Sequence, residues 1–148
     1  MKRCVYLILE NEPIAKDTYR MVFAGDASAF TAPGQFLNLS VSGLYLRRPF
    51  SVCEWEENRV TIVYKVVGAG TQKMASFRCG REVDVLVGLG RGFDTAKSGP
   101  NPLLIGGGAG VPPMMMLCRK LLAEGKKPMV AMGFGSAGEV FFEEDFKK

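Results

Sequence analysis

The sequence predicts a six-stranded antiparallel Greek-key β-barrel followed by the first half of a doubly wound parallel α/β domain. Up to about residue 88, short runs of β-branched and aromatic residues alternate with turn-forming residues, as in closed antiparallel barrels. After a linker rich in Gly, Ser, Pro and Asn at about 92–101, the pattern changes to strand, helix, strand and helix, which is typical of a parallel sheet. A chain of 148 residues suits one domain or two very small ones.

The barrel strands are predicted from six apolar runs that turn formers separate. The separating residues are Gly25-Asp26, Pro33-Gly34, Glu57-Asn58 and Gly80, and Gly, Pro, Asn and Asp favour chain reversals. One helix, which opens on Gly70-Thr71, is expected to interrupt the strands at about 70–78. The expected strands are 4–15, 18–25, 35–42, 48–56, 59–67 and 83–90.

The second unit begins with an apolar strand at 102–110 that runs into glycines. A helix is expected at 111–125, with proline near its start and glycine past its end. A second buried strand is expected at 127–135, and another helix begins within 139–148. A parallel sheet that is buried on both faces needs roughly 100 residues or more. We therefore expect a barrel domain at 1–95 and an incomplete nucleotide-binding domain at 101–148.

Composition excludes several classes of site. The chain is 47% hydrophobic and 23% charged, and its formal charge of +4 suits an anionic cofactor but lacks the basic stripe of a nucleic-acid-binding protein. Histidine is absent, which removes a Ser-His-Asp triad and any imidazole metal ligand. The four cysteines, at 4, 53, 79 and 118, have no metal-box spacing, so no metal site is expected.

The chain is expected to be a cytoplasmic protein that does not cross a membrane. No run approaches the roughly 18 apolar residues that a membrane span needs, and the N-terminal stretch lacks the features of a signal peptide. Widely spaced cysteines are most simply reduced thiols.

Residues Arg48-Pro49-Phe50-Ser51 form the first candidate binding motif. An arginine can neutralise a pyrophosphate, an aromatic ring can lie against an isoalloxazine, and a serine hydroxyl can hydrogen-bond flavin nitrogens. Proline suits the start or edge of a strand. The alternative is a plain edge strand with solvated arginines and a core phenylalanine.

The second candidate motif is the run VYKVVGAGT, which ends at Gly70-Thr71. A strand delivers Tyr64 and Lys65, and the glycines then allow a tight turn into a helix whose first backbone N–H groups are free to bind phosphate. The alternative is an ordinary strand-to-helix connection whose Tyr and Lys are solvated.

A third motif follows the strand at 102–110. Gly108, Gly110 and Pro113 spell GxGxxP, which is close to a dinucleotide fingerprint but ends in proline. The alternative is a tight turn without a ligand. Near the C-terminus, the acidic residues Glu143, Glu144 and Asp145 are interpreted first as a favourable arrangement at a helix start, not as catalytic groups.

Together these motifs resemble the ferredoxin reductase superfamily, in which a flavin-binding barrel precedes a nicotinamide-binding domain. Arg48 to Ser51 stand in place of that family's Arg-x-Tyr-Ser, and Gly107 to Pro113 look like its Thr-Gly-Thr-Gly-Ile-Ala-Pro. The runs VYKVVGAGT, DVLVGLGRGFD and LLIGGGAGVPP are most similar to one branch, the electron-transfer subunits of dihydroorotate dehydrogenase B.

The resemblance implies a set of ligands and partners. FAD would be held by Arg48 to Ser51, Val63 to Lys65, and Gly70-Thr71, and NAD(H) by the GxGxxP turn. Electrons would pass from NADH through FAD and an iron–sulfur cluster to a catalytic dihydroorotate dehydrogenase subunit, in pyrimidine biosynthesis. Members of the family continue for roughly a hundred residues more and carry a cysteine box for a 2Fe–2S cluster, and neither occurs in these 148 residues.

Two alternatives remain at this point. One is a ferredoxin–NADP reductase-like or sulfide dehydrogenase-like flavin subunit with another electron acceptor. The other is a non-catalytic assembly module, in which the open edge of the second sheet serves for association, for example as a homodimer.

Overall fold

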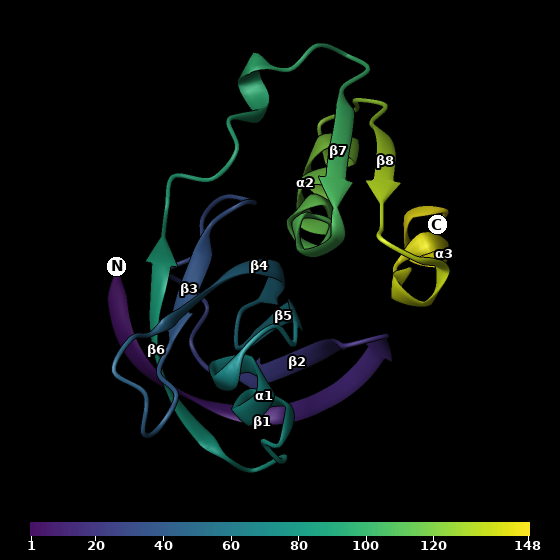
Figure 1. Ribbon diagram of the computed structural model, residues 1–148. Coiled ribbons are helices and arrows are strands. Elements are labelled where there is room, and N and C mark those ends of the chain that lie inside the picture. The colour runs from purple at the N-terminus through teal and green to yellow at the C-terminus, as the bar shows by residue number, and fades with distance from the viewer.

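A computed structural model describes all of residues 1–148. A closed barrel lies at one end of the molecule and a smaller α/β unit at the other, joined by a long peripheral connection (Figure 1). The barrel strands are β1 (Lys2–Ala15), β2 (Thr18–Ala24), β3 (Phe36–Leu39), β4 (Arg48–Glu56), β5 (Arg59–Lys65) and β6 (Glu82–Leu89).

The predicted barrel is confirmed. Its strands lie in the order β1-β2-β5-β4-β3-β6 and all pair antiparallel, with β6 closing against β1. Alternate residues of each strand point inward, so the largest core cluster is formed by side chains from all six strands and is completed by Met74 and Phe77. The pairing registers of β1 and β4 are each interrupted by irregularities, which help the strands to bend around the core.

Helix α1 (Ala69–Ala75) follows β5 and replaces the predicted 70–78 with a slightly shorter segment. Its C-terminal end is fixed to the barrel by Asn11, whose side-chain amide donates to the carbonyls of Met74 and Phe77 at 2.8 and 3.0 Å. Burial of Met74, which is 0% exposed, anchors the same end. The N-terminal end of α1 therefore belongs to a helix that is fixed to the barrel.

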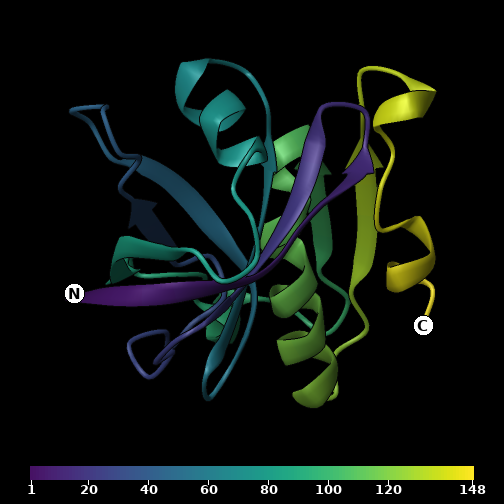
Figure 2. The ribbon, with the colours of Figure 1, turned by 90° about the horizontal axis from the view of Figure 1, so that it is seen from below.

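The second unit contains a two-stranded parallel sheet and one long helix. Strand β7 (Leu103–Gly107) pairs with β8 (Met129–Gly133), and α2 (Pro112–Ala123) connects them. Figure 2 shows α2 between the barrel and this sheet. The remaining elements are the short 3-10 helices η1 (Thr95–Lys97), η2 (Gly108–Gly110) and η3 (Ala137–Glu139), and the one-turn helix α3 (Glu143–Phe146).

The expectation of a second buried strand at 127–135 is wrong for this structure. No residue of β8 is buried, and on the neighbouring β7 Leu103 and Ile105 are 56% and 72% exposed. Helix α2 covers one face of the sheet, whereas no layer within these residues covers the other face. The apolar run predicted a strand correctly, but burial depends on a layer that these residues do not supply.

The two units meet through an apolar cluster. Its buried members are Cys53 and Val63 from the barrel with Val111, Met115 and Phe141 from the second unit. An ion pair of 2.9 Å between Arg119 on α2 and Glu54 on β4 lies at the same interface. None of the helices combines the length and the apolar character that crossing a membrane requires.

Candidate functional site

The candidate site lies where β4 and β5 diverge. These neighbouring strands pair with each other only over the segment from Val52 and Ile62 to Glu56 and Arg59. Residues 48–51 of β4 instead pair with β3, and residues 63–65 of β5 pair with β2. The facing backbone edges of these two segments are therefore not paired with each other. The candidate flavin residues on both strands border this open region.

Arg48 brings the first motif to the second. Its guanidinium lies against Gly70, where a Cβ atom would stand 3.1 Å from Arg48 Cζ. Glycine thus permits a close approach that any side chain would obstruct. Nη1 of Arg48 donates to the carbonyl of Leu46, and no carboxylate pairs with the guanidinium. The result is an unneutralised cation at the start of α1.

The preceding residue, Arg47, bonds to Asp84 on β6. Arg47 Nη2 donates to Asp84 Oδ2 at 2.8 Å, and its Nη1 donates to the Asp84 backbone carbonyl at 3.2 Å. Arg3 also binds this carboxylate. Hydrogen bonds from Arg3 and Arg47 lower the pKa of Asp84 to about 2. Only Arg48 of the two neighbouring arginines is therefore available to an anionic ligand.

Thr71 contributes its backbone to this region, since its hydroxyl is already used. Oγ1 accepts from the amides of Val67 and Gly68 at 2.9 and 3.2 Å and donates to the Gly68 carbonyl at 3.0 Å. This network fixes the turn before α1. The amides of Ala69, Gly70 and Thr71 have no carbonyl partner in a preceding helical turn, so these donors remain for a ligand beside Arg48.

The aromatic residues of the two motifs contact each other. The Phe50 ring lies 5.8 Å from the Tyr64 ring, and Tyr64 also stacks on Tyr19 at 5.7 Å. The Tyr64 hydroxyl donates to Asn11 at 2.9 Å, and burial raises its pKa. Tyr64 is therefore a core side chain that can face a ligand only through its backbone, whereas Phe50 is only partly buried.

The other two residues of the first motif also pair with β3 and differ in exposure. Pro49 is opposite Asn38 and exposed, and Ser51 is opposite Phe36 and half-buried. Proline has no amide hydrogen to donate, so Pro49 offers a ligand no backbone donor.

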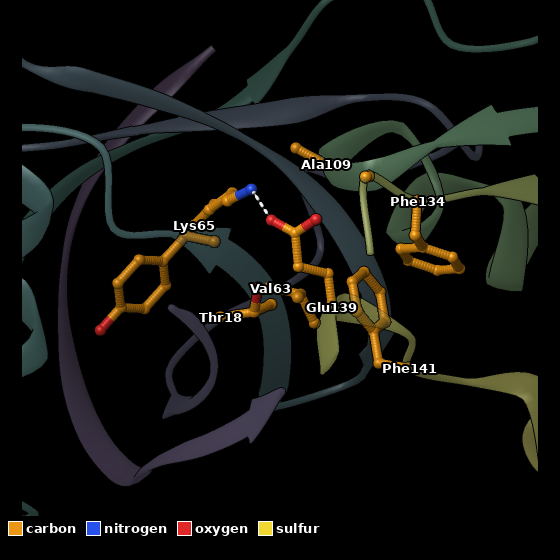
Figure 3. Close-up of a pocket in the computed structure, with 10 residues that line it drawn as sticks. Thr18, Val63, Lys65, Ala109, Phe134, Glu139 and Phe141 are labelled. Carbon is orange, nitrogen blue, oxygen red and sulfur yellow. Dashed lines mark hydrogen bonds and ion pairs between the residues drawn. The ribbon is translucent and has the colours of Figure 1, made fainter. Parts of the chain in front are cut away.

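A small cleft of about 50 Å³ separates the end of β5 from the second unit (Figure 3). Lys65 Nζ forms a hydrogen bond and ion pair with Glu139 across this cleft. The bonded ammonium is the main cause that lowers the pKa of the Glu139 carboxyl. The walls are formed by Thr18, Val63, Tyr64 and Lys65 of the barrel and by Gly108, Ala109, Phe134, Gly135, Glu139 and Phe141.

No sequence motif marks Glu139 as part of a site. It begins the run EVFFEEDFKK, which predicts a helix, and nothing in that pattern signals a partner on β5. The structure instead ends η3 at Glu139 and begins α3 at Glu143. Only the folded chain brings residues 65 and 139 together.

The GxGxxP residues lie at the junction of β7 and α2. Gly108 and Gly110 form η2, and Gly108 also lines the cleft. The turn is tight, since a Cβ atom on Gly106 would lie 3.0 Å from the Gly110 carbonyl oxygen. Pro113 is buried in the first turn of α2, so its ring packs in the protein interior next to this turn.

The cysteines do not gather into a site. All four are free, and Cys53 is buried at the interface between the units, where burial raises the pKa of its thiol. No group of three or more His, Cys, Asp or Glu side chains is arranged to hold a metal ion.

Comparison with known proteins yields close relatives but no matching family model. The chain is 44% identical over 147 residues to the dihydroorotate dehydrogenase B (NAD(+)) electron transfer subunit of Fusobacterium nucleatum, covering 94% of this chain and 57% of that protein. The equivalent subunits of Shouchella clausii and Bacillus mycoides are 42% and 38% identical, over 58% and 60% of their lengths. The chain thus spans less than two thirds of these relatives.

Solved structures give the same fold. A cytochrome P450 reductase from Amycolatopsis superposes with a TM-score of 0.88 at 25% identity, covering 99% of this chain and 47% of that one. Phthalate dioxygenase reductase, described as a modular structure for electron transfer from pyridine nucleotides to a 2Fe–2S centre, superposes with a TM-score of 0.79 at 25% identity and covers 99% and 48%. These matches confirm the predicted fold class and the resemblance that the motifs carried.

Proposed function

We propose that this chain, a homologue of the dihydroorotate dehydrogenase B electron transfer subunits, is the FAD-binding part of such a subunit. In this proposal it carries electrons from NADH through FAD towards a catalytic dihydroorotate dehydrogenase subunit in the cytoplasm. The names of its relatives support this choice over a ferredoxin–NADP reductase-like subunit with another acceptor. Residues 1–95 would form the FAD-binding domain, and residues 101–148 part of the NAD-binding domain.

One structural relationship carries the proposal: the Arg48 guanidinium lies against Gly70 at the start of α1. An unneutralised cation and free helix amides at one place suit a pyrophosphate, because charge and hydrogen-bond donors act on the same oxygens. The site also has an open backbone edge beside Phe50 and Ser51, where β4 and β5 diverge. The residues present therefore fit FAD.

Each candidate residue has a distinct role in this proposal. Arg48 and the amides of Gly70 and Thr71 would bind the pyrophosphate, and Phe50 and Ser51 would border the flavin ring beside Pro49. Val63 and Tyr64 would offer backbone groups, and Lys65 a cation. FAD supplies the redox chemistry when bound, whereas the chain positions it and excludes water.

The second unit would approach the flavin site with the dinucleotide turn. Gly108 lines the cleft beside Lys65, which supports a role for Gly108, Gly110 and Pro113 in binding NAD(H). The cysteine ligands of a 2Fe–2S cluster are not among these 148 residues, so no electron step through such a cluster is assigned to this chain.

The test compares two arginine variants of the barrel. Arg48→Ala should weaken FAD binding by about tenfold to a hundredfold, since hydrogen bonds to charged groups contribute about 1.5–3 kcal/mol. Arg78→Ala is the control, because Arg78 is exposed and forms no ion pair or side-chain hydrogen bond. Titration of apoprotein with FAD, followed by flavin fluorescence, measures both. Equal affinities in the two variants would remove the assigned pyrophosphate site.

A further inference from the structure

Lys65 is the one charged candidate FAD residue whose side chain bonds to the other unit. Its ammonium bonds to Glu139 across the cleft (Figure 3). The pair is partly shielded, with 40% of the Lys65 side chain and 18% of the Glu139 side chain exposed. A carboxylate this close cancels much of the field that the ammonium exerts on another anion.

Glu139 is held in position by its own surroundings. Its amide donates to the Ser136 carbonyl at 3.1 Å, and the Ser136 hydroxyl lies 3.4 Å from Glu139 Oε2. The segment is fixed to the barrel where the Lys16 amide donates to the Gly138 carbonyl at 2.8 Å. The carboxylate is therefore delivered to Lys65 by the docked second unit.

The contact between the units does not depend on this ion pair alone. The apolar cluster that includes Val63, Met115 and Phe141 lies at the same interface, and burial of such side chains contributes more than a partly exposed ion pair. Removing the Glu139 charge should therefore leave the units together. What changes is the charge that Lys65 offers to the cleft.

We propose that Glu139 is a positioning residue of the flavin site that acts through Lys65. It draws the ammonium towards the second unit and partly neutralises it, so the attraction of the barrel for an anionic cofactor depends on whether the second unit is docked. This inference rests on the proposed binding of FAD near Lys65. It assigns a role in tuning cofactor affinity to a residue outside the three candidate motifs.

The experiment is a double-mutant cycle on FAD affinity. Glu139→Gln keeps the shape and removes the charge, and it should tighten FAD binding on the order of fivefold, the scale of one partly exposed ion pair. The gain should shrink at high salt because it is electrostatic. Lys65→Met should weaken binding, and adding Glu139→Gln to Lys65→Met should have no further effect. Glu144→Gln, which removes an equal charge from the exposed α3, should leave the affinity unchanged.

Two results would overturn the inference while FAD binding itself persists. One is an unchanged or weaker affinity in Glu139→Gln, and the other is an equal gain in the Lys65→Met background, which would indicate direct repulsion of FAD by Glu139. If the unmodified chain binds no FAD, the proposed function falls and this inference with it.

A second readout needs no cofactor. NMR titration of the Glu139 carboxyl carbon should give a pKa below the ordinary glutamate value in the unmodified chain. That pKa should rise in Lys65→Met, although Lys16 still contributes some attraction. The same pKa in both proteins would show that Lys65 is not the partner of Glu139 in solution and would overturn the inference.

Discussion

The Arg47 guanidinium is bonded twice to Asp84, once at the carboxylate and once at the backbone carbonyl. This contact ties the start of β4 to β6, across the short strand β3 that lies between them. The neighbouring Arg48 is thereby left free to lie over Gly70. The two adjacent arginines therefore have different roles: Arg47 fixes the strand, and Arg48 faces the proposed ligand.

Replacing Arg47 should disturb the site indirectly. We expect Arg47→Ala to lower the free energy of unfolding by about 1 kcal/mol, because a partly buried charged pair is lost. FAD affinity should fall less than in Arg48→Ala. Chemical denaturation and FAD titration of both variants measure the two effects, and a larger loss of affinity in Arg47→Ala would reverse the assigned roles.

The low pKa of Asp84 predicts how the stability of the fold changes in acid. Its pKa is about 2 in the folded chain against an ordinary value of 3.8. A depressed carboxyl pKa stabilises the fold above the unfolded pKa, and that contribution is lost as pH falls from about 4 towards about 2.

Asp84→Asn should remove this contribution. At pH 6 it should be less stable than the unmodified chain, and the difference in urea midpoint should narrow between about pH 4 and about pH 2. A constant difference across that range would mean that the carboxylate is not the source of the stabilisation.

A side chain at Gly70 is predicted to weaken FAD binding without lowering the stability of the fold. In Gly70→Ala the new methyl would lie 3.1 Å from Arg48 Cζ, so the guanidinium must move, whereas alanine suits a helix better than glycine does by roughly 0.5–1 kcal/mol. We expect unchanged or higher thermal stability together with weaker FAD binding. Gly99→Ala, where nothing lies within 4 Å, serves as control. Retained FAD affinity in Gly70→Ala would contradict the close approach of Arg48.

The interface between the units should depend on Met115. It is 4% exposed and belongs to the apolar cluster that joins α2 to the barrel. Met115→Ala should lower the free energy of unfolding by about 2–5 kcal/mol. It should also make the linker at 90–102 more accessible to protease. Met129→Ala, at a position that is 60% exposed, should be cleaved by protease at the same rate as the unmodified chain. Equal cleavage of the two variants would argue against this interface.

Most of the fold could be predicted from the sequence because its signals are local. All six barrel strands, α1, α2 and the parallel pair follow from alternation, turn residues and helix ends. The exposure of β8 could not be predicted, because burial of a strand depends on whether a second layer covers the sheet. The side-chain roles of Tyr64 and Thr71 also required the structure, since long-range pairing with Asn11 and a local turn network leave no trace in a motif.

The candidate site divides in the same way. The two motifs suggest one shared ligand but not a direct contact, and the structure places the Arg48 guanidinium against Gly70. Glu139 was missed because its partner is Lys65, from the opposite unit. Residue type and spacing indicate a ligand, but they do not reveal which charges from elsewhere in the chain compete for the same groups.

Reconstitution of this 148-residue chain with FAD tests the proposed cofactor site most directly. After removal of free cofactor, we expect a yellow protein that retains one FAD per chain and releases it on denaturation. The flavin should be lost far more readily from Arg48→Ala than from Arg78→Ala. A folded, colourless protein that retains no FAD after reconstitution would show that this chain is not an FAD-binding unit.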